Sequence, residues 1–173
     1  MKKPSSPLKK LSFHSPLFDL RIGQTGKVTA IDMQVHGLVV NTSEIPETLN
    51  FLEENYPGVL RTQCFNDKNL PFSTEVIQTE IGHLFEHILI DNLCALKIRS
   101  GAKSAIFNGT TSWNWQQNPY GSFQIWIDVG REELELLIEG LKITIDLTKK
   151  LMEAGNRHFG VEDNSYKNLR ATV

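Results

Sequence analysis

The sequence is poor in cysteine and has no excess of charge of either sign. Cys64 and Cys94 are the only cysteines in 173 residues, and they do not form a Cys-x-x-Cys pair. This count excludes a disulfide-stapled scaffold and favours a reduced, cytoplasmic compartment. The 18 lysines and arginines are balanced by 20 acidic residues, which leaves a net charge of -2. That balance argues against a dedicated binder of nucleic acid or of anionic membranes.

Long apolar runs are also missing. No uninterrupted apolar stretch approaches the roughly 18 residues that are needed to span a bilayer. The basic N-terminus, MKKPSSPLKKL, has no apolar segment after its lysines, so it does not predict a secretory signal peptide. We therefore expect neither a membrane nor a nucleic acid among the partners.

The residues that are present predict one globular domain. Hydrophobic residues make up 40% of the chain and charged residues 22%, which is enough apolar material for a core. We expect a flexible lead-in over residues 1–16, which are rich in proline, serine and lysine. A single domain over 17–155 and a polar tail over 156–173 complete the division.

The hydrophobic pattern predicts an α+β domain, in which a small, mostly antiparallel sheet packs against two long helices on one of its faces. In the first part of the chain we expect strands within 18–40 with a turn at Gln24-Thr25-Gly26, and then a short helix from Pro46 to Tyr56. A long helix follows from Ser73 or Thr74 to about Ile98, with Gly101 as its stop. The remaining elements are a short strand over 104–107, a loop over 108–121, a strand over 123–129 and a second long helix over 131–154.

One motif on the first long helix indicates chemistry. His83-Leu84-Phe85-Glu86-His87 is an H-x-x-E-H sequence, the reversed form of the H-E-x-x-H zinc motif. Histidines four residues apart lie on one helix face, so both can reach one cation, and Glu86 could then act as a general base. The alternative is an ordinary charged surface or a core histidine. However, the motif points away from the main apolar face and shares its own face with Ile90 and Cys94, which is typical of a cleft floor.

A catalytic zinc site needs a third protein ligand. The sequence offers Asp128 at the end of a strand, and Glu132 or Glu133 in the first turn of the last helix. Acidic residues in a first turn also stabilise the helix dipole without any metal, so all three carboxylates stay open as candidates. Cys94 is about 16 Å of helix rise from His83, and we expect it to pack rather than to share an ion.

The stretch from Thr79 to Ile88 resembles the N-terminal domain of cyanophycin synthetases, in which Gly-His-x-x-Glu-His-[Ile/Val]-Ala opens a similar helix. Further similarities cover roughly residues 27–150. Upstream, the family's short helix, Leu-Pro step and His-x-Cys fall near Ile45-Pro46, Tyr56-Pro57 and Cys64. Downstream, the segment from Phe123 to Glu133 is similar to the family's Val-Val-Phe-Glu-Tyr strand and the Glu-Glu pair that follows it. Where the family has Gly-Phe-Gly-Arg-Thr-Arg, residues 106–111 lack both arginines.

The resemblance implies a stand-alone, zinc-dependent hydrolase of a peptide or amide bond, with an isopeptide or an amino-acid polymer among the candidate substrates. It carries His83 and His87 over as metal ligands and Glu86 as the general base, and among the carboxylates it favours Glu133 as the third ligand. The missing arginines argue against specificity for the aspartate–arginine polymer. The other functions to consider are a non-catalytic module that binds a peptide or polymer and an accessory subunit of an amide ligase.

The loop after the first long helix is rich in aromatic residues. Trp113, Asn114 and Trp115 could form a wall for a peptide or polymer substrate, and Trp126 could line the same cleft. Alternatively, the two loop tryptophans close the small core of a hairpin. A homodimer is a further partner to test.

Overall fold

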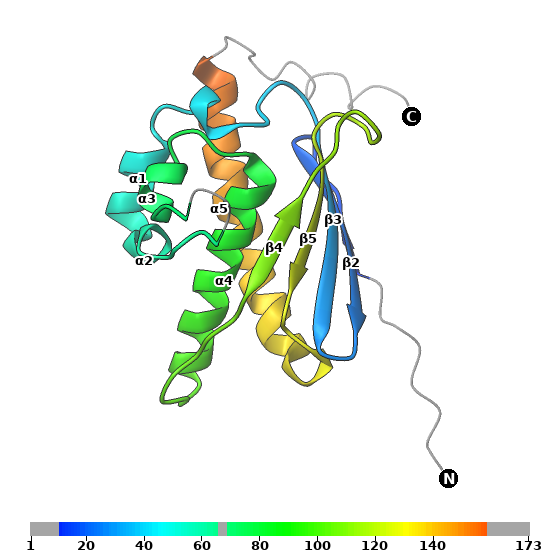
Figure 1. The fold of residues 1–173 in the computed structure, drawn as a ribbon, viewed down its shortest axis with the longest axis vertical. Coiled ribbons are helices and arrows are strands. Elements are labelled where there is room, and N and C mark those ends of the chain that lie inside the picture. The colour runs from blue at the N-terminus through cyan, green and yellow to red at the C-terminus, as the bar shows by residue number, and fades with distance from the viewer. Residues whose placement is uncertain (1–10, 66–68, 159–173) are drawn as a thin grey trace, which may run out of the picture.

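The computed structural model describes residues 11–65 and 69–158, which form a sheet with two long helices packed on one of its faces (Figure 1). The strands are β1 (Leu11–Phe13), β2 (Phe18–Thr25), β3 (Val28–Val35), β4 (Gly109–Ser112) and β5 (Ser122–Ile127). The α-helices are α1 (Thr48–Asn55), α2 (Pro57–Leu60), α3 (Phe72–Glu75), α4 (Ile81–Arg99) and α5 (Leu134–His158), and short 3-10 helices occupy Thr42–Glu44 (η1) and Arg131–Glu133 (η2).

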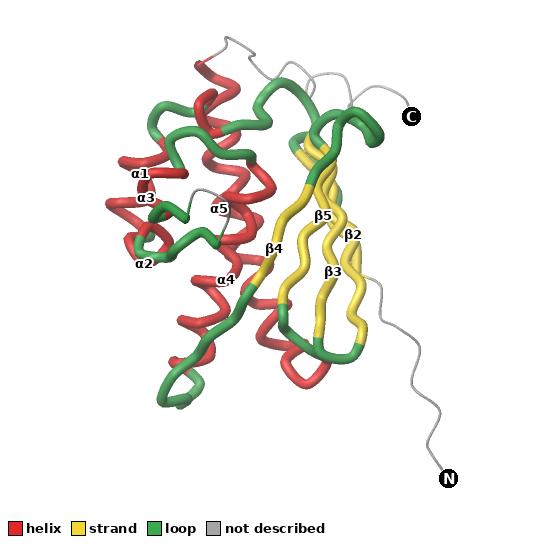
Figure 2. The backbone as a smooth tube through the Cα atoms, in the orientation of Figure 1, coloured by secondary structure: helices red, strands yellow, loops and turns green. Residues whose placement is uncertain are grey.

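The sheet is antiparallel throughout, with the strand order β1-β2-β3-β5-β4. Alternate residues on each central strand are buried toward the helices, for example Leu20, Ile31 and Ile125. This period of two is what a sheet with one covered face requires. The expected α+β class, with helices on one side of a small antiparallel sheet, is confirmed (Figure 2).

The two long helices run antiparallel to each other and form the second layer. Asn92 of α4 donates to Thr144 of α5, while Lys97, near the end of α4, pairs with Glu133 just before α5 begins. The small helices α1, α2 and α3 lie beside α4 on the side away from the sheet edge (Figure 1). One face of α4 therefore packs on the sheet and α5, and another faces the α2–α3 segment and β4.

Some element boundaries differ from the prediction. The first long helix begins at Ile81, not at Ser73 or Thr74, because α3 ends at Glu75 and a turn intervenes before Glu80 adopts the extended conformation that precedes α4. Residues 104–107 form no strand; the strand at this edge of the sheet is β4, which lies inside the predicted loop. Gly101 ends α4 as expected, with a φ of 101° that favours glycine.

The ends of the chain are only partly described. Leu11–Phe13, within the predicted lead-in, form β1 at the edge of the sheet, whereas residues 1–10 and the tail over 159–173 lie outside the described residues. Within the described part of the chain, no helix combines the length and the apolarity that crossing a bilayer requires.

Candidate metal centre

The start of α4 is anchored by main-chain pairing with a distant segment. Ile81 N donates to Val40 O, Thr42 N donates to Thr79 O, and Asn41 and Glu80 form an isolated β-bridge. These contacts fix the first turn of α4, so His83 and His87 have a defined direction. Both histidines project from the helix face that points away from the sheet core.

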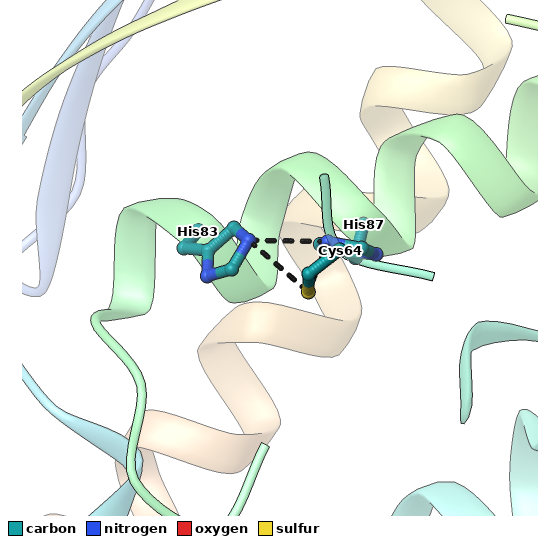
Figure 3. A group of neighbouring side chains, drawn as sticks. All are labelled: Cys64, His83 and His87. Carbon is teal, nitrogen blue, oxygen red and sulfur yellow. Dashed lines mark hydrogen bonds between the residues drawn. The ribbon is translucent and has the colours of Figure 1, made fainter. Parts of the chain in front are cut away.

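Cys64 joins the two histidines on this face, as Figure 3 shows. The His83 and His87 Nε2 atoms are 3.1 Å apart, and the Cys64 Sγ lies 3.7 Å from the first and 3.4 Å from the second. Cys64 is buried, His87 is buried, and His83 is half-buried. Three atoms that can each bind a cation therefore meet at one point, and the cluster could hold a metal ion.

Cys64 reaches the cluster because its segment pairs with the residues just before α3. Cys64 N donates to Leu70 O, and Phe72 N donates to Thr62 O on the same short ladder. Phe72 then stacks on the His87 ring, with ring centroids 3.8 Å apart and planes inclined by 11°. The 62–64 segment and Phe72 thus cover the histidine face and keep the imidazoles in place.

Hydrogen bonds determine which nitrogen of His87 carries the proton. Thr62 Oγ1 lies 2.8 Å from His87 Nδ1 and donates its own hydrogen to Val59 O at 2.7 Å. Since a hydroxyl has one hydrogen, Thr62 must accept from His87 Nδ1–H, which leaves a lone pair on Nε2. Thr79 Oγ1 lies 2.7 Å from His83 Nδ1, a contact in which either atom can carry the hydrogen.

The 3.1 Å distance between the two Nε2 atoms fits two positions of the His83 proton. With that proton on Nε2, His83 donates to His87 Nε2. With it on Nδ1, both Nε2 lone pairs are free to bind a cation beside the cysteine sulfur. Histidine ligands with their outer nitrogen tied to a hydroxyl or carbonyl are typical of metal sites.

Glu86 lies next to the cluster and is also buried. Thr111 Oγ1 of β4 donates to its Oε2 at 2.5 Å, so the edge strand holds the carboxylate. Gly109 makes this approach possible, because a Cβ at that position would lie 2.8 Å from Glu86 Oε1 and 3.0 Å from Ile90 Cδ1. The sheet edge therefore positions the glutamate of the H-x-x-E-H motif.

Burial dominates the electrostatics of these groups. It raises the pKa of Glu86 to about 7, although the bond from Thr111 opposes the shift. Burial, together with the negative charges of Glu75 and Glu86, raises the pKa of the Cys64 thiol to about 11. Burial and the neighbouring His83 lower the pKa of His87 to about 3, and burial lowers that of His83 as well. Both histidines are therefore neutral at pH 7, the form that binds metal.

A cavity of about 1000 Å³ opens over the cluster. Its walls are α4, the segments over 62–65 and 70–80 and the edge formed by residues 105–111, and His83, Glu86 and His87 all line it. Its mouth is apolar, since Phe65, Ile77 and Ile106 line it and are largely exposed to solvent. This size suits a ligand of several residues or a small molecule of similar bulk.

The structure does not bring the predicted carboxylate ligands to this site. Glu133 lies in η2 and pairs with Lys97, ten residues beyond His87, which is about 15 Å further along α4. Asp128 accepts hydrogen bonds from the main-chain N and the side-chain Nδ2 of Asn108. Glu132 precedes α5 beside Glu133. Glu133 therefore lies away from the two histidines in this structure, and Cys64 is the residue that joins them in a group that could hold a metal ion.

The predicted aromatic wall is divided between different surfaces. Trp113 lines the cavity, but Trp115 packs on Tyr120 and Phe123 and donates to Ser122 O, so it closes the core instead. Asn114 accepts from Gln116 N and lines a smaller pocket on the other side of Trp113. Trp126 is 36% exposed on the face of the sheet that the helices do not cover, because its neighbours in β5 point inward.

Comparisons with models of protein families, with curated proteins and with solved structures found no match to this chain.

Proposed function

We propose that this protein is a zinc-dependent hydrolase of a peptide or amide bond, with Cys64, His83 and His87 as metal ligands and Glu86 as the general base. The observation that carries the proposal is the convergence of three potential metal-ligand atoms, from Cys64, His83 and His87, at the floor of a cavity. The sequence resemblance to the cyanophycin synthetase N-terminal domain supports the same chemistry for the H-x-x-E-H motif.

The distances in the cluster suit zinc. Tetrahedral ligands at zinc bond lengths of about 2.0–2.3 Å lie about 3.3–3.6 Å from one another, so the 3.1, 3.4 and 3.7 Å separations need shifts of only a few tenths of an ångström. Thiolate and imidazole together favour zinc over magnesium or calcium, which prefer oxygen ligands. Three protein ligands with a fourth position facing a cavity are typical of catalytic sites.

When bound, zinc polarises the scissile carbonyl and lowers the pKa of a water molecule toward about 7. Glu86 accepts a proton from the attacking water as the water oxygen bonds to the carbonyl carbon. Glu86 then returns the proton to the leaving nitrogen as the C–N bond breaks, so the products are a carboxylic acid and an amine. Thr111 and Gly109 keep the carboxylate of Glu86 in position for both transfers.

Metal analysis and turnover test the proposal together. Purified wild type should bind one zinc ion per chain, and the Cys64→Ala and His83→Ala variants should lose it. Cys94→Ala is the matched control, because Cys94 lines the same cavity outside the cluster. A Cys64→Ala protein that binds zinc as tightly as wild type would exclude this ligand set.

Glu86→Gln should keep the metal and lose about 10²–10⁴-fold in the turnover of short peptides or of a β-linked isopeptide. Glu133→Gln, which lies at the other end of α4, should change neither property. Zinc and peptide binding without turnover in wild type would favour the alternative of a non-catalytic peptide-binding module.

A further inference from the structure

A carboxylate that the proposed chemistry does not use lies beside the metal centre. Glu75, the last residue of α3, is only 8% exposed and lines the same cavity as His83 and Glu86. Its Oε1 is buried and has no hydrogen-bond partner among the described residues. A buried carboxylate oxygen without a partner is costly, and native structures retain such a group where a ligand or ion satisfies it.

Glu75 is close enough to the cluster to act on its charges. Its negative charge adds to the raised pKa of Cys64 and opposes the lowered pKa of His83. It is nevertheless absent from the set of ligand atoms that lie within 4.8 Å of one another. The Glu75 carboxylate therefore faces the cavity next to the cation position without being one of the ligands.

The rest of the cavity favours a positively charged ligand. Of the described residues that line it, none is lysine or arginine, whereas three are glutamates: Glu75, Glu80 and Glu86. A dication bound by the Cys64 thiolate would keep one positive charge, and the carboxylates of Glu75 and Glu86 would outweigh it. A ligand carrying one positive charge would restore the balance in a site where the low dielectric makes imbalance costly.

We propose that Glu75 binds the protonated amine of the substrate, so that the substrate class is a peptide or amide with a free amino group next to the scissile bond. This assignment rests on the proposed hydrolase function. A carboxylate beside the cluster can receive an ammonium group attached to the carbon next to the scissile carbonyl, while Phe65, Ile77 and Ile106 at the mouth contact an apolar side chain. An acetylated amine has no charge and cannot form this pair.

The test compares L-phenylalanine amide with its N-acetyl derivative, which differ only at the amine. Zinc-loaded wild type should hydrolyse the free-amine compound with a kcat/KM at least about tenfold higher, the ratio expected when a buried charge-assisted hydrogen bond is made by one substrate only. Glu75→Gln should reduce this preference to within about twofold, mainly through KM, and should leave the acetylated compound unchanged. Glu75→Asp, which keeps the charge, should retain part of the preference.

A second measurement separates this inference from the hydrolase proposal. Binding of the two compounds to metal-free protein is followed by calorimetry, in wild type, in Glu75→Gln and in the control Glu132→Gln, whose glutamate is exposed and lies outside the cavity. The role of Glu75 in amine binding is supported if the free-amine compound binds wild type and Glu132→Gln at least about tenfold more tightly than it binds Glu75→Gln. If neither compound is hydrolysed but this difference holds, the hydrolase proposal fails and the amine site stands.

Two results would overturn the role of Glu75. Equal affinity of wild type and Glu75→Gln for the free amine would show that the carboxylate does not recognise it. Loss of zinc from Glu75→Gln, measured by metal analysis, would instead make Glu75 a metal ligand.

Discussion

Gly82 leaves no space for a side chain where the start of α4 meets β5, so Gly82→Ala tests how rigidly the sheet supports the site. A Cβ at this position would lie 2.4, 2.6 and 2.8 Å from the Cγ, Cδ1 and Cβ atoms of Phe123. Carbon atoms in contact prefer about 3.5–4.0 Å, so the helix and the ring must separate by about 1 Å. Phe123 is buried and is flanked by the rings of Trp113 and Trp115, which obstruct its rotation.

The expected cost follows from these contacts. Overpacking of this kind costs about 1–3 kcal/mol, and three contacts this short put Gly82→Ala at the upper end of that range. The higher helix propensity of alanine offsets about 1 kcal/mol of this cost. The net loss is about 2 kcal/mol, which in a chain of this length lowers Tm by about 4–8 °C.

Thermal unfolding followed by circular dichroism measures this loss. Gly23→Ala is the matched control, because nothing lies within 4 Å of a Cβ at Gly23 in β2. In a double-mutant cycle, Phe123→Leu should relieve part of the clash, so that the two changes together cost at least about 1 kcal/mol less than their sum. A Gly82→Ala protein as stable as Gly23→Ala, or simple additivity of Gly82→Ala and Phe123→Leu, would refute the predicted clash.

Three further predictions concern the site and its surroundings. Thr111→Val removes a hydrogen bond that lowers the pKa of Glu86, so the acidic limb of the kcat/KM profile should move to higher pH from about pH 7. Thr110→Val, at an exposed position, should leave this limb in place. An unchanged limb in Thr111→Val would show that Glu86 is not the group that transfers the proton. Zinc at 100 times its Kd should stabilise wild type by about 2.7 kcal/mol, seen as a higher Tm in differential scanning fluorimetry, and an equal rise in Cys64→Ala would contradict the ligand set. Burial raises the pKa of Asp91 despite a neighbouring arginine, so the folded protein holds this proton more tightly than the unfolded chain, and wild-type stability falls as pH rises past the ordinary carboxyl range. In urea unfolding, the stability of Asp91→Asn relative to wild type should therefore increase between pH 3 and pH 7. A stability difference that stays constant over this range would disprove burial of Asp91 as the cause.

Local patterns predicted much of the fold and two of the three residues of the cluster. The alternation in residues 18–35 and 123–127 specified β2, β3 and β5, since one buried face leaves a period of two, whereas β1 and β4 at the two edges were not predicted. Histidines four residues apart on α4 were recognisable because a helix brings such positions together whatever surrounds it. The covered histidine face, expected from Ile90 and Cys94, is also present.

The third member of the cluster, Cys64, depended on tertiary structure. Cys64 reaches the histidines only through the pairing of residues 62–64 with the start of α3, a contact between irregular segments that no hydrophobic period encodes. Its match near a His-x-Cys in the cyanophycin synthetase resemblance was the one available signal. Glu133 was misplaced because the antiparallel arrangement of α4 and α5 puts the first turn of α5 beside the far end of α4, next to Lys97.

The separation of Cys64 from His83 along the chain has a consequence for folding. A cation held by both would close a loop of about 20 residues, as a disulfide does, and would remove chain entropy from the unfolded state on the order of 3 kcal/mol. That loop includes α3 and Glu75, so the same cross-link would fasten the cavity wall that faces the ligand. Removal of the metal by a chelator would then expose this wall to proteolysis before the sheet unfolds. The concentration of available metal would therefore set the lifetime of the binding surface.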